Sequence, residues 1–168
     1  MRASDAEHFA RTLGDARVTQ WSARFPGKIN LGQARSLVKG QQAASRSGTG
    51  YTFSVKTHAG TPVGFVSLRN VRAKVHPEAD TSPDAILGYW FNPQHWGQGY
   101  ATEAVKEVVR FAFKSLGLKR INASCFIQNH KSQKLLDRVG FHMEGVRKKG
   151  RVRKGRYYDE ATYGIVRP

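Results

Sequence analysis

The sequence predicts an α+β fold built on a mixed β-sheet, and three observations lead to this class. Apolar residues recur at helical spacing in some segments and form short β-rich runs in others. Along the chain these segments come as two helices, three strands, a helix, a strand, a helix and two strands, an order typical of α+β chains. The length of 168 residues suits one domain with its own core, so residues 1–168 are expected to form a single domain.

The first part of the chain contains two predicted helices. Residues 5–17 carry their apolar side chains on one face, and the residues between Asn30 and about Gln42 show the same pattern. Asn30 is a favoured residue type at a helix N-cap. The polar, glycine-containing segment 45–50 is expected to separate these helices from the strands that follow.

Three strands are expected next. Residues 51–56 and 62–68 are rich in β-forming side chains, and the short segment 58–61 between them suits a hairpin turn. Residues 72–83 are charged and contain two prolines, so we expect a loop. The apolar run at 85–91 is typical of a buried strand.

In the second half, helices and strands alternate. Residues 102–116 and 129–139 have apolar side chains at helical spacing, and each segment is followed by a glycine that suits a helix C-terminus, Gly117 and Gly140. The expected strands are 119–127, 141–148 and 157–166. The last two are expected to form a hairpin around a basic connection.

The chain carries a large excess of positive charge. There are 28 Lys and Arg residues against 12 Asp and Glu, which gives a formal net charge of +16. Such a charge attracts anions and suits a polyanionic cofactor, an acidic protein or a nucleic acid, while it disfavours a polycationic substrate. The alternative is that the basic composition serves only solubility. The single cysteine, Cys125, excludes an internal disulfide and is expected to be buried.

Neither a signal peptide nor a membrane span is predicted. The N-terminal segment is polar and helical, and no apolar run approaches the roughly 20 residues of a membrane-spanning helix. We therefore expect a soluble, cytoplasmic protein without a membrane partner, either a monomer or a homodimer.

The junction between residues 91 and 104 carries the strongest functional signal. A buried strand ends near Asn92, a turn containing Gly97 and Gly99 follows, and a helix begins at once. The glycines let the backbone approach a ligand closely, and the first N–H groups of a helix lack partners and attract anions. This combination suits a phosphate. It lacks the Lys-Ser/Thr of a P-loop and the third glycine of the dinucleotide fingerprint, and a purely structural turn is the alternative.

The segment Trp96-Gly-Gln-Gly-Tyr-Ala101 resembles the (Gln/Arg)-x-x-Gly-x-(Gly/Ala) pyrophosphate loop of the GNAT superfamily of acetyltransferases. The following segments resemble its ribosomal-protein N-terminal (Rim-type) subgroup: Leu87–Trp90, Trp96–Ala104, Asn129–Ser132, Val139–Phe141, Glu144-Gly145 and Gly155–Asp159. Two features depart from the family. Trp96 stands where Gln or Arg is usual, and the first family strand, expected before Asp5, is nearly absent.

The resemblance implies a GNAT fold, a mixed and twisted sheet splayed at its centre with helices on both faces. Acetyl-CoA would bind as co-substrate where strands 85–91 and 119–127 part. The backbone of Phe91 would bind the acetyl or pantetheine group, and an N–H there can stabilise an oxyanion. The pyrophosphate would be held, mainly by backbone groups, at Trp96, Gly97, Gln98, Gly99, Tyr100, Ala101 and Thr102. The side chain of Trp96 is not expected to matter.

Asn129 and Ser132 are three residues apart at a predicted helix start, so their side chains can share a face. Taken alone, both residues are typical helix caps. The resemblance instead implies that Asn129 binds the pantetheine arm and that Ser132 protonates the leaving thiolate as the catalytic acid. Lys131 and Lys134 are candidates for contacts with the CoA phosphates, with a solvated helix face as the alternative.

The implied reaction is direct transfer of the acetyl group to a neutral amine, and no metal is expected because the cysteine and histidines lack metal-ligand spacing. No general base stands out. The position where some relatives have a carboxylate is occupied by Arg151. The remaining candidates, besides solvent, are Glu78, Asp80, Asp84, Tyr157 and Tyr158.

The basic segment Arg147–Arg156 has seven cations in ten residues. It is either a solvated turn or an anion site on the acceptor side that attracts an acidic peptide, a ribosome or a tRNA. Three functions therefore stay open. The main expectation is acetylation of a protein N-terminal α-amine or a small primary amine. The alternatives are acetylation of aminoacyl-tRNA and non-catalytic binding of acetyl-CoA or RNA.

Overall fold

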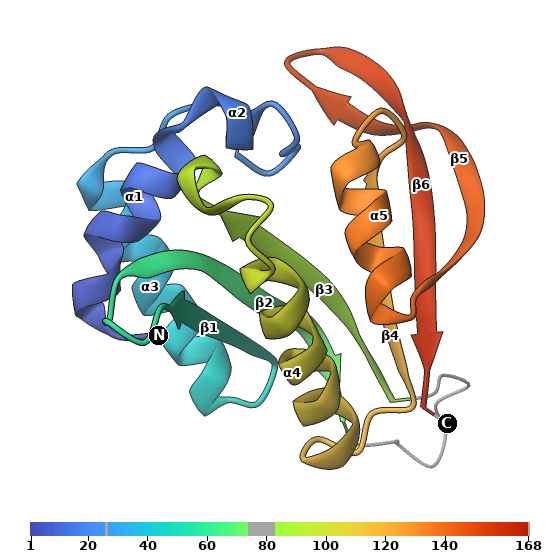
Figure 1. Ribbon diagram of the computed structural model, residues 1–168, viewed down its shortest axis with the longest axis horizontal. Coiled ribbons are helices and arrows are strands. Elements are labelled where there is room, and N and C mark those ends of the chain that lie inside the picture. The colour runs from blue at the N-terminus through green and yellow to red at the C-terminus, as the bar shows by residue number, and fades with distance from the viewer. Residues whose placement is uncertain (26, 74–82, 168) are drawn as a thin grey trace.

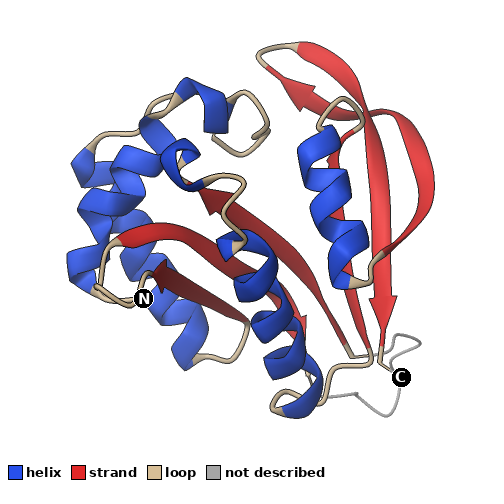
Figure 2. Ribbon diagram, in the orientation of Figure 1, coloured by secondary structure: helices blue, strands red, loops and turns tan. Residues whose placement is uncertain are grey.

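A computed structural model describes residues 1–25, 27–73 and 83–167, and over these residues the chain forms a six-stranded sheet with helices on both faces (Figures 1 and 2). The strand order is β1-β2-β3-β4-β6-β5, with β3 and β4 parallel and the other neighbours antiparallel. The strands are β1 (Gly50–Lys56), β2 (Pro62–Arg72), β3 (Asp84–Phe91), β4 (Arg120–Phe126), β5 (His142–Arg153) and β6 (Arg156–Val166). The predicted α+β class and mixed sheet are confirmed.

The predicted helices are present, with changes at their ends. The helical elements are η1 (Ala3–Asp5), α1 (Ala6–Gly14), α2 (Ala16–Thr19), α3 (Leu31–Arg46), η2 (Pro93–His95), α4 (Tyr100–Lys114) and α5 (His130–Val139). The first predicted helix is interrupted at Asp15, whose extended backbone and side-chain oxygen cap α2. Asn30 caps α3 as predicted, in a reciprocal pair with Gln33. This helix continues past Gln42 to Arg46.

The two helical layers pack on opposite faces of the sheet (Figure 1). On one face α1 and α3 bury Phe9, Leu13 and Val38 together with Phe65 of β2. On the other face α4 and α5 pack on a larger apolar cluster that includes Val105 and residues of β2, β3, β4 and β6. Burying each such side chain stabilises the fold by about 1.5–3 kcal/mol.

The sheet splays between its two parallel strands. β3 and β4 pair only from Asp84 opposite Arg120 to Ile86 opposite Asn122. Beyond these residues the strands part, and Figure 1 shows them diverging from the lower end of the molecule toward the top. The splayed GNAT-like sheet that the resemblance implied is therefore present.

The structure corrects several predicted boundaries. The basic segment after residue 148 is not a simple connection, because β5 extends to Arg153 and pairs with β6, with an irregular register between Arg147 and Arg151. β2 continues beyond Leu68 to Arg72, whose side chain pairs with Asp84 of β3. Of the predicted loop at 72–83, residues 74–82 lie outside the described part of the chain. No helix within that described part is long and apolar enough to cross a membrane.

Candidate active site

The open end of the splay holds a cavity of ≈ 680 Å³. Residues from β3, β4, the start of α4, α5 and the segment 18–24 line it. Of the predicted site residues, the cavity lining includes Phe91, Trp96, Gly97, Gly99, Ala101, Thr102, Asn129, Lys131, Ser132 and Lys134. Two others lie outside the lining: Gln98 turns its amide back to the Gln94 carbonyl, and the Tyr100 ring packs near His95.

The loop before α4 has the geometry of a phosphate cradle. Gly97 and Gly99 have φ of 78° and 88°, a backbone region that favours glycine. A Cβ at either position would meet no atom within 4 Å, so the glycines face open space. Gly99 is the N-cap of α4, whose first N–H groups have no partner inside the helix and lie at the positive end of its dipole.

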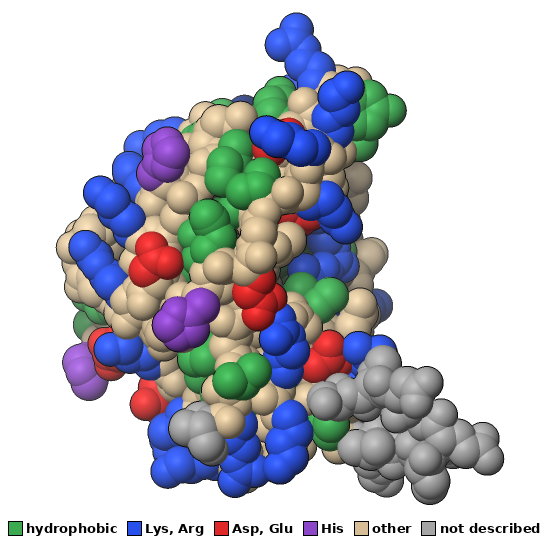
Figure 3. Space-filling view, turned by 90° about the vertical axis from the view of Figure 1, so that its right-hand side faces the viewer, with side chains coloured by type: hydrophobic (Ala, Val, Ile, Leu, Met, Phe, Trp, Pro, Cys, Tyr) green, Lys and Arg blue, Asp and Glu red, His purple; other side chains and the backbone are tan. Residues whose placement is uncertain are grey.

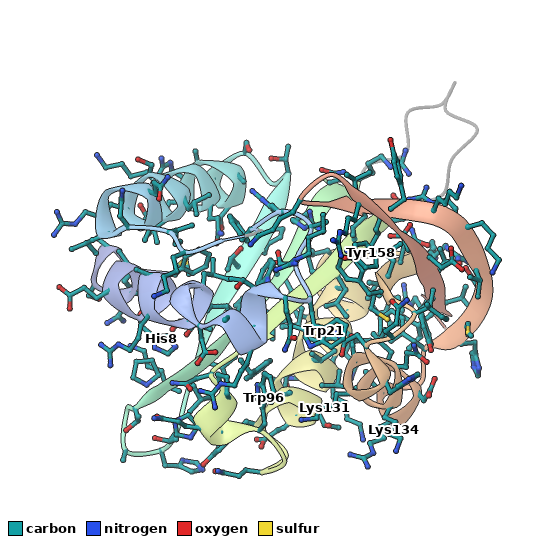
Figure 4. The ribbon with its side chains drawn as sticks, turned by 90° about the horizontal axis from the view of Figure 1, so that it is seen from above. His8, Trp21, Trp96, Lys131, Lys134 and Tyr158 are labelled. Carbon is teal, nitrogen blue, oxygen red and sulfur yellow. The ribbon has the colours of Figure 1, made fainter. Side chains whose placement is uncertain are left out.

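The side chain of Trp96 helps to hold the loop before α4 in place, a role that we did not expect. Its backbone N–H donates to the Pro93 carbonyl at 3.3 Å and is therefore already engaged. The indole Nε1 donates to the Phe91 carbonyl at 2.9 Å and ties the loop to the end of β3. Lys131 Nζ lies 4.8 Å from the centre of the indole ring. Figure 4 shows Trp96, Lys131 and Lys134 along one side of the open end.

The end of β3 directs one backbone donor into the splay. Asn92 donates its N–H to the Val63 carbonyl of β2 at 2.9 Å. Because an antiparallel strand alternates its hydrogen-bonding direction, the N–H and carbonyl of Phe91 point away from β2 and toward the splay. The carbonyl of Phe91 accepts the hydrogen bond from Trp96 Nε1, so the N–H of Phe91 is the group that faces the cavity without a partner in the loop.

Ser132 is held by a partner that the sequence analysis missed. Its Oγ lies 2.6 Å from the hydroxyl of Tyr89, which comes from β3. Burial raises the pKa of the Tyr89 phenol, and the hydrogen bond with Ser132 opposes this only in part. Tyr89 is therefore protonated at neutral pH and can donate to Ser132 Oγ, which frees the serine proton. The sequence offered one signal for this role. Side chains alternate between the two faces of a strand, so Tyr89 lies on the same face of β3 as Leu87 and Phe91.

Asn129 serves as a cap and lies on the cavity at the same time. Its Oδ1 accepts the N–H of Ser132 at 3.2 Å, the capping role that the sequence left open. This bond uses the side-chain oxygen, so the amide NH₂ group stays available to a ligand. Ser132 itself does not cap the helix, because its hydroxyl is engaged with Tyr89.

The candidates for a general base that the structure describes, Asp84, Tyr157 and Tyr158, do not line the cavity. Asp84 lies at the closed end of the splay, where it pairs with Arg72 at 2.7 Å and accepts from Asn122. Tyr157 is 67% exposed on the hairpin, and the Tyr158 ring packs against Phe126. Glu78 and Asp80 lie outside the described residues. Among the described residues that line the cavity there is no carboxylate, which is compatible with proton loss to solvent.

Two carboxylates of β6 offset part of the charge of the basic hairpin. Glu160 of β6, only 5% exposed, pairs with Arg147 and with Arg151, the latter at 2.9 Å. Lys148 pairs with Asp159 at 2.9 Å. Figure 3 looks onto this side of the molecule and shows carboxylates among the basic side chains, with further cations projecting at the top. Arg151 also donates to the Ser124 carbonyl and lines the cavity.

Comparison with known proteins gives a consistent set of similarities. Residues 1–142 match the family model of the acetyltransferase (GNAT) domain. The uncharacterized N-acetyltransferase YoaA of Bacillus subtilis is 40% identical over 169 residues, which cover 98% of this chain and 89% of that protein. The ribosomal-protein-serine acetyltransferase of Escherichia coli is 30% identical over 82 residues, 49% of this chain and 46% of that protein.

A solved structure is similar over almost the whole chain. Mycobacterium smegmatis RimJ, in complex with CoA-disulfide, has a TM-score of 0.82 and 26% identity. The alignment covers 99% of this chain and 79% of that chain. The family match ends at the first residue of β5, so it includes both strands of the splay and the loop before α4.

Proposed function

The chain belongs to the GNAT family of acetyl-CoA-dependent N-acetyltransferases, and we propose that its acceptor is a protein N-terminal α-amine or a small primary amine. The observation that carries this proposal is the cavity in the splay, which runs from the loop before α4 past Ser132 to Arg24 and Arg69. A thioester bound from one side can therefore meet an amine that enters from the other.

The residues of the cavity suit each part of acetyl-CoA. The pyrophosphate is proposed to bind the N–H groups of the loop and first turn of α4, residues 97–102, with Lys131 and Lys134 beside them. The NH₂ group of Asn129 is available to a carbonyl of the pantetheine arm. The N–H of Phe91 is proposed to bind the thioester oxygen and, as the negative charge develops, the oxyanion.

Acetyl transfer then follows from these groups. The lone pair of the neutral amine attacks the thioester carbon, the C–N bond forms, and the C–S bond breaks as the tetrahedral intermediate collapses. The amine proton passes to water. Ser132 gives its hydroxyl proton to the CoA thiolate while Tyr89, which keeps its own proton, donates a hydrogen bond to the serine oxygen. Ser132 then regains a proton from the water that received the amine proton. In this scheme Ser132 is the catalytic acid and Tyr89 is a positioning residue.

The similarity to a ribosomal-protein-serine acetyltransferase supports an N-terminal α-amine as acceptor. We do not extend the proposal to aminoacyl-tRNA. Three of the hairpin cations on which that alternative depends, Arg147, Lys148 and Arg151, pair with carboxylates of β6. Arg153 donates to the Thr19 carbonyl. Fewer cations are therefore available for the phosphates of a nucleic acid.

The experiment combines a binding measurement with a turnover measurement. Saturating acetyl-CoA should raise the melting temperature, because it binds the folded state. Thiol release should then be followed with N-terminal peptides, small primary amines, polyamines, aminoglycosides and aminoacyl-tRNA. Peptides or small amines should be acetylated and polyamines should be poor acceptors, since the chain carries +16. Stabilisation by acetyl-CoA without turnover of any amine would overturn the proposal, as would turnover of aminoacyl-tRNA alone.

A further inference from the structure

A second cavity lies on the opposite face of the splayed sheet, next to α3. It measures ≈ 1420 Å³ and is lined by one side of α3, residues 24, 25 and 27–30, and parts of β1 and β2. Arg24, Arg69 and Trp90 line this cavity and also the cavity of the splay. These three residues therefore lie at the junction of the two cavities, next to the proposed entry of the amine acceptor.

Strand register fixes the side on which Arg69 lies. Ser67 faces Gly88 and Phe65 faces Trp90 across β2 and β3, so these residues and Arg69 share one face of the sheet. Phe65 packs against Phe9 of α1 with ring centroids 4.7 Å apart, which identifies this as the α1–α3 face. Tyr89 and Phe91 face the other side, where Ser132 lies.

The side chain of Arg69 lies beside Gly88 of β3. A Cβ built on Gly88 would lie 3.8 Å from Nε of Arg69, so the side chain passes over the glycine. Gly88 lies two residues beyond Ile86, the last residue of β3 that pairs with β4. The cation is therefore placed at the point where the two strands have just separated.

Arg24 and Arg69 carry charge that the described residues do not neutralise. Nε of Arg69 is buried without a hydrogen-bond partner, and within residues 1–25, 27–73 and 83–167 no carboxylate pairs with either arginine. Burial lowers the pKa of the Arg69 guanidinium, and the positive charges of Arg24 and Arg151 lower it further. An arginine stays charged under these conditions. Of the three, Arg151 alone has a carboxylate partner, Glu160.

Arg69 is half-buried with its Nε lacking a partner, which is a costly arrangement that a bound anion relieves. We propose that Arg24 and Arg69 together bind an anionic group of the acceptor, a carboxylate or a phosphate, beside the amine that is acetylated. This deepens the proposed function by naming the substrate class. Planar guanidinium groups match the oxygens of both anions. The CoA phosphates do not explain these arginines, because their proposed site is the start of α4 on the other side of the splay.

Matched acceptors test the proposal directly. Peptides that begin Ser-Glu or Ser-Gln, and O-phosphoethanolamine or ethanolamine, differ mainly in one anionic group and separate the carboxylate source from the phosphate source. The wild type should prefer the anionic member of at least one pair by about 10–100-fold in kcat/KM, as expected for charge-assisted hydrogen bonds. Equal kcat/KM values within both pairs would overturn the anion site.

Three variants locate the preference. Arg24→Gln and Arg69→Gln should each abolish most of it while leaving the KM for acetyl-CoA unchanged. Arg110→Gln is the control, since Arg110 lies exposed on α4 and pairs with Glu107. Arg24 is exposed, so its variant is expected to fold even where Arg69→Gln does not. A preference that survives in Arg24→Gln contradicts the proposal.

A binding measurement separates this proposal from the proposed function. With CoA saturating, so that the cofactor site is occupied, inorganic phosphate should raise the melting temperature of the wild type and of Arg110→Gln more than that of Arg24→Gln. Equal shifts in all three proteins overturn the anion site, whatever the turnover. A smaller shift in Arg24→Gln without turnover of any amine keeps the anion site and overturns the proposed function.

Discussion

The two sides of the splay present different kinds of groups to their ligands. On the α4–α5 side, the cavity is lined by the backbone of Gly97, Gly99, Ala101 and Thr102 around the start of α4 and by the neutral hydroxyls of Ser132 and Tyr89. On the α1–α3 side it offers the cationic side chains of Arg24 and Arg69. The position of a backbone donor is set by the conformation of the chain, whereas an arginine donor is present only where the sequence has an arginine. The first side is thus suited to a fixed cofactor and the second to selection among acceptors.

The largest expected effect concerns the hydroxyl on the cofactor side. Ser132→Ala removes the proposed proton donor to the thiolate, and we expect kcat to fall about 100-fold or more. The melting-temperature shift produced by acetyl-CoA should change little, because the loop before α4 is intact. Steady-state kinetics and thermal shifts on the same preparation measure both quantities.

Tyr89→Phe is the matched variant for Ser132→Ala. It removes only the partner of Ser132 Oγ, so kcat should fall less than in Ser132→Ala. The double variant should resemble Ser132→Ala alone, because Tyr89 acts through the serine. A normal kcat in Ser132→Ala would show that the hydroxyl is merely structural and that chemistry on this side rests on backbone groups.

The next effect concerns the backbone itself. Gly99→Val places a branched side chain in the open space before α4, and we expect the KM for acetyl-CoA to rise about 30-fold through loss of phosphate contacts. Gly60→Val is the control. Gly60 has a similar φ of 82° and also faces open space, but it lies in the β1–β2 turn.

Comparing these two glycine variants separates backbone strain from ligand contact. Both should lose similar stability, because a side chain is disfavoured at positive φ. Gly99→Val alone should change the KM for acetyl-CoA, measured from initial rates at saturating acceptor. Equal KM values in both variants would mean that the loop before α4 does not contact the cofactor.

The residues of the proposed cofactor side were easier to predict from the sequence than those of the proposed acceptor side. The cofactor side is built from short contiguous segments, so Gly97, Gly99, Asn129 and Ser132 were identified from local spacing and from family resemblance. For the acceptor side the sequence pointed to the hairpin Arg147–Arg156 and not to Arg24 and Arg69. Arg24 and Arg69 are separated by strands and helices, and only the pairing of β2 with β3 brings Arg69 over Gly88.

Two features that the sequence did not predict, one at Trp96 and one in the hairpin, depend on contacts between residues that local spacing does not define. The bond from Trp96 Nε1 to the Phe91 carbonyl depends on the path of the turn, which residue spacing does not define. The hairpin strands were predicted too short because local charge suggested a solvated turn. In the structure Glu160 pairs with both Arg147 and Arg151 across the strands, which favours continued pairing.

The two sides should respond differently to acid, and this is the smallest effect we expect. His8 of α1 is 6% exposed, packs against Phe65 on the acceptor side and lies 3.4 Å from the Thr12 hydroxyl. Burial lowers the pKa of His8 to about 4; nearby Arg11 adds to the shift and Asp5 opposes it. On the cofactor side, burial instead raises the pKa of Tyr89 and Cys125, so both stay neutral in acid.

The sign of the acid effect follows from the two pKa values of His8. Above about pH 6.5 the ring is neutral in both states. Between about 6.5 and 4 only the unfolded chain gains the proton, so the free energy of unfolding falls as the pH falls, by on the order of 1 kcal/mol at pH 5.5. Urea unfolding at pH 7 and 5.5 measures this difference. The difference in the free energy of unfolding between the two pH values should be smaller in His8→Asn than in the wild type. It should be unchanged in His58→Asn, because His58 is exposed in the β1–β2 turn. An unchanged difference in His8→Asn would assign the acid sensitivity to groups outside α1.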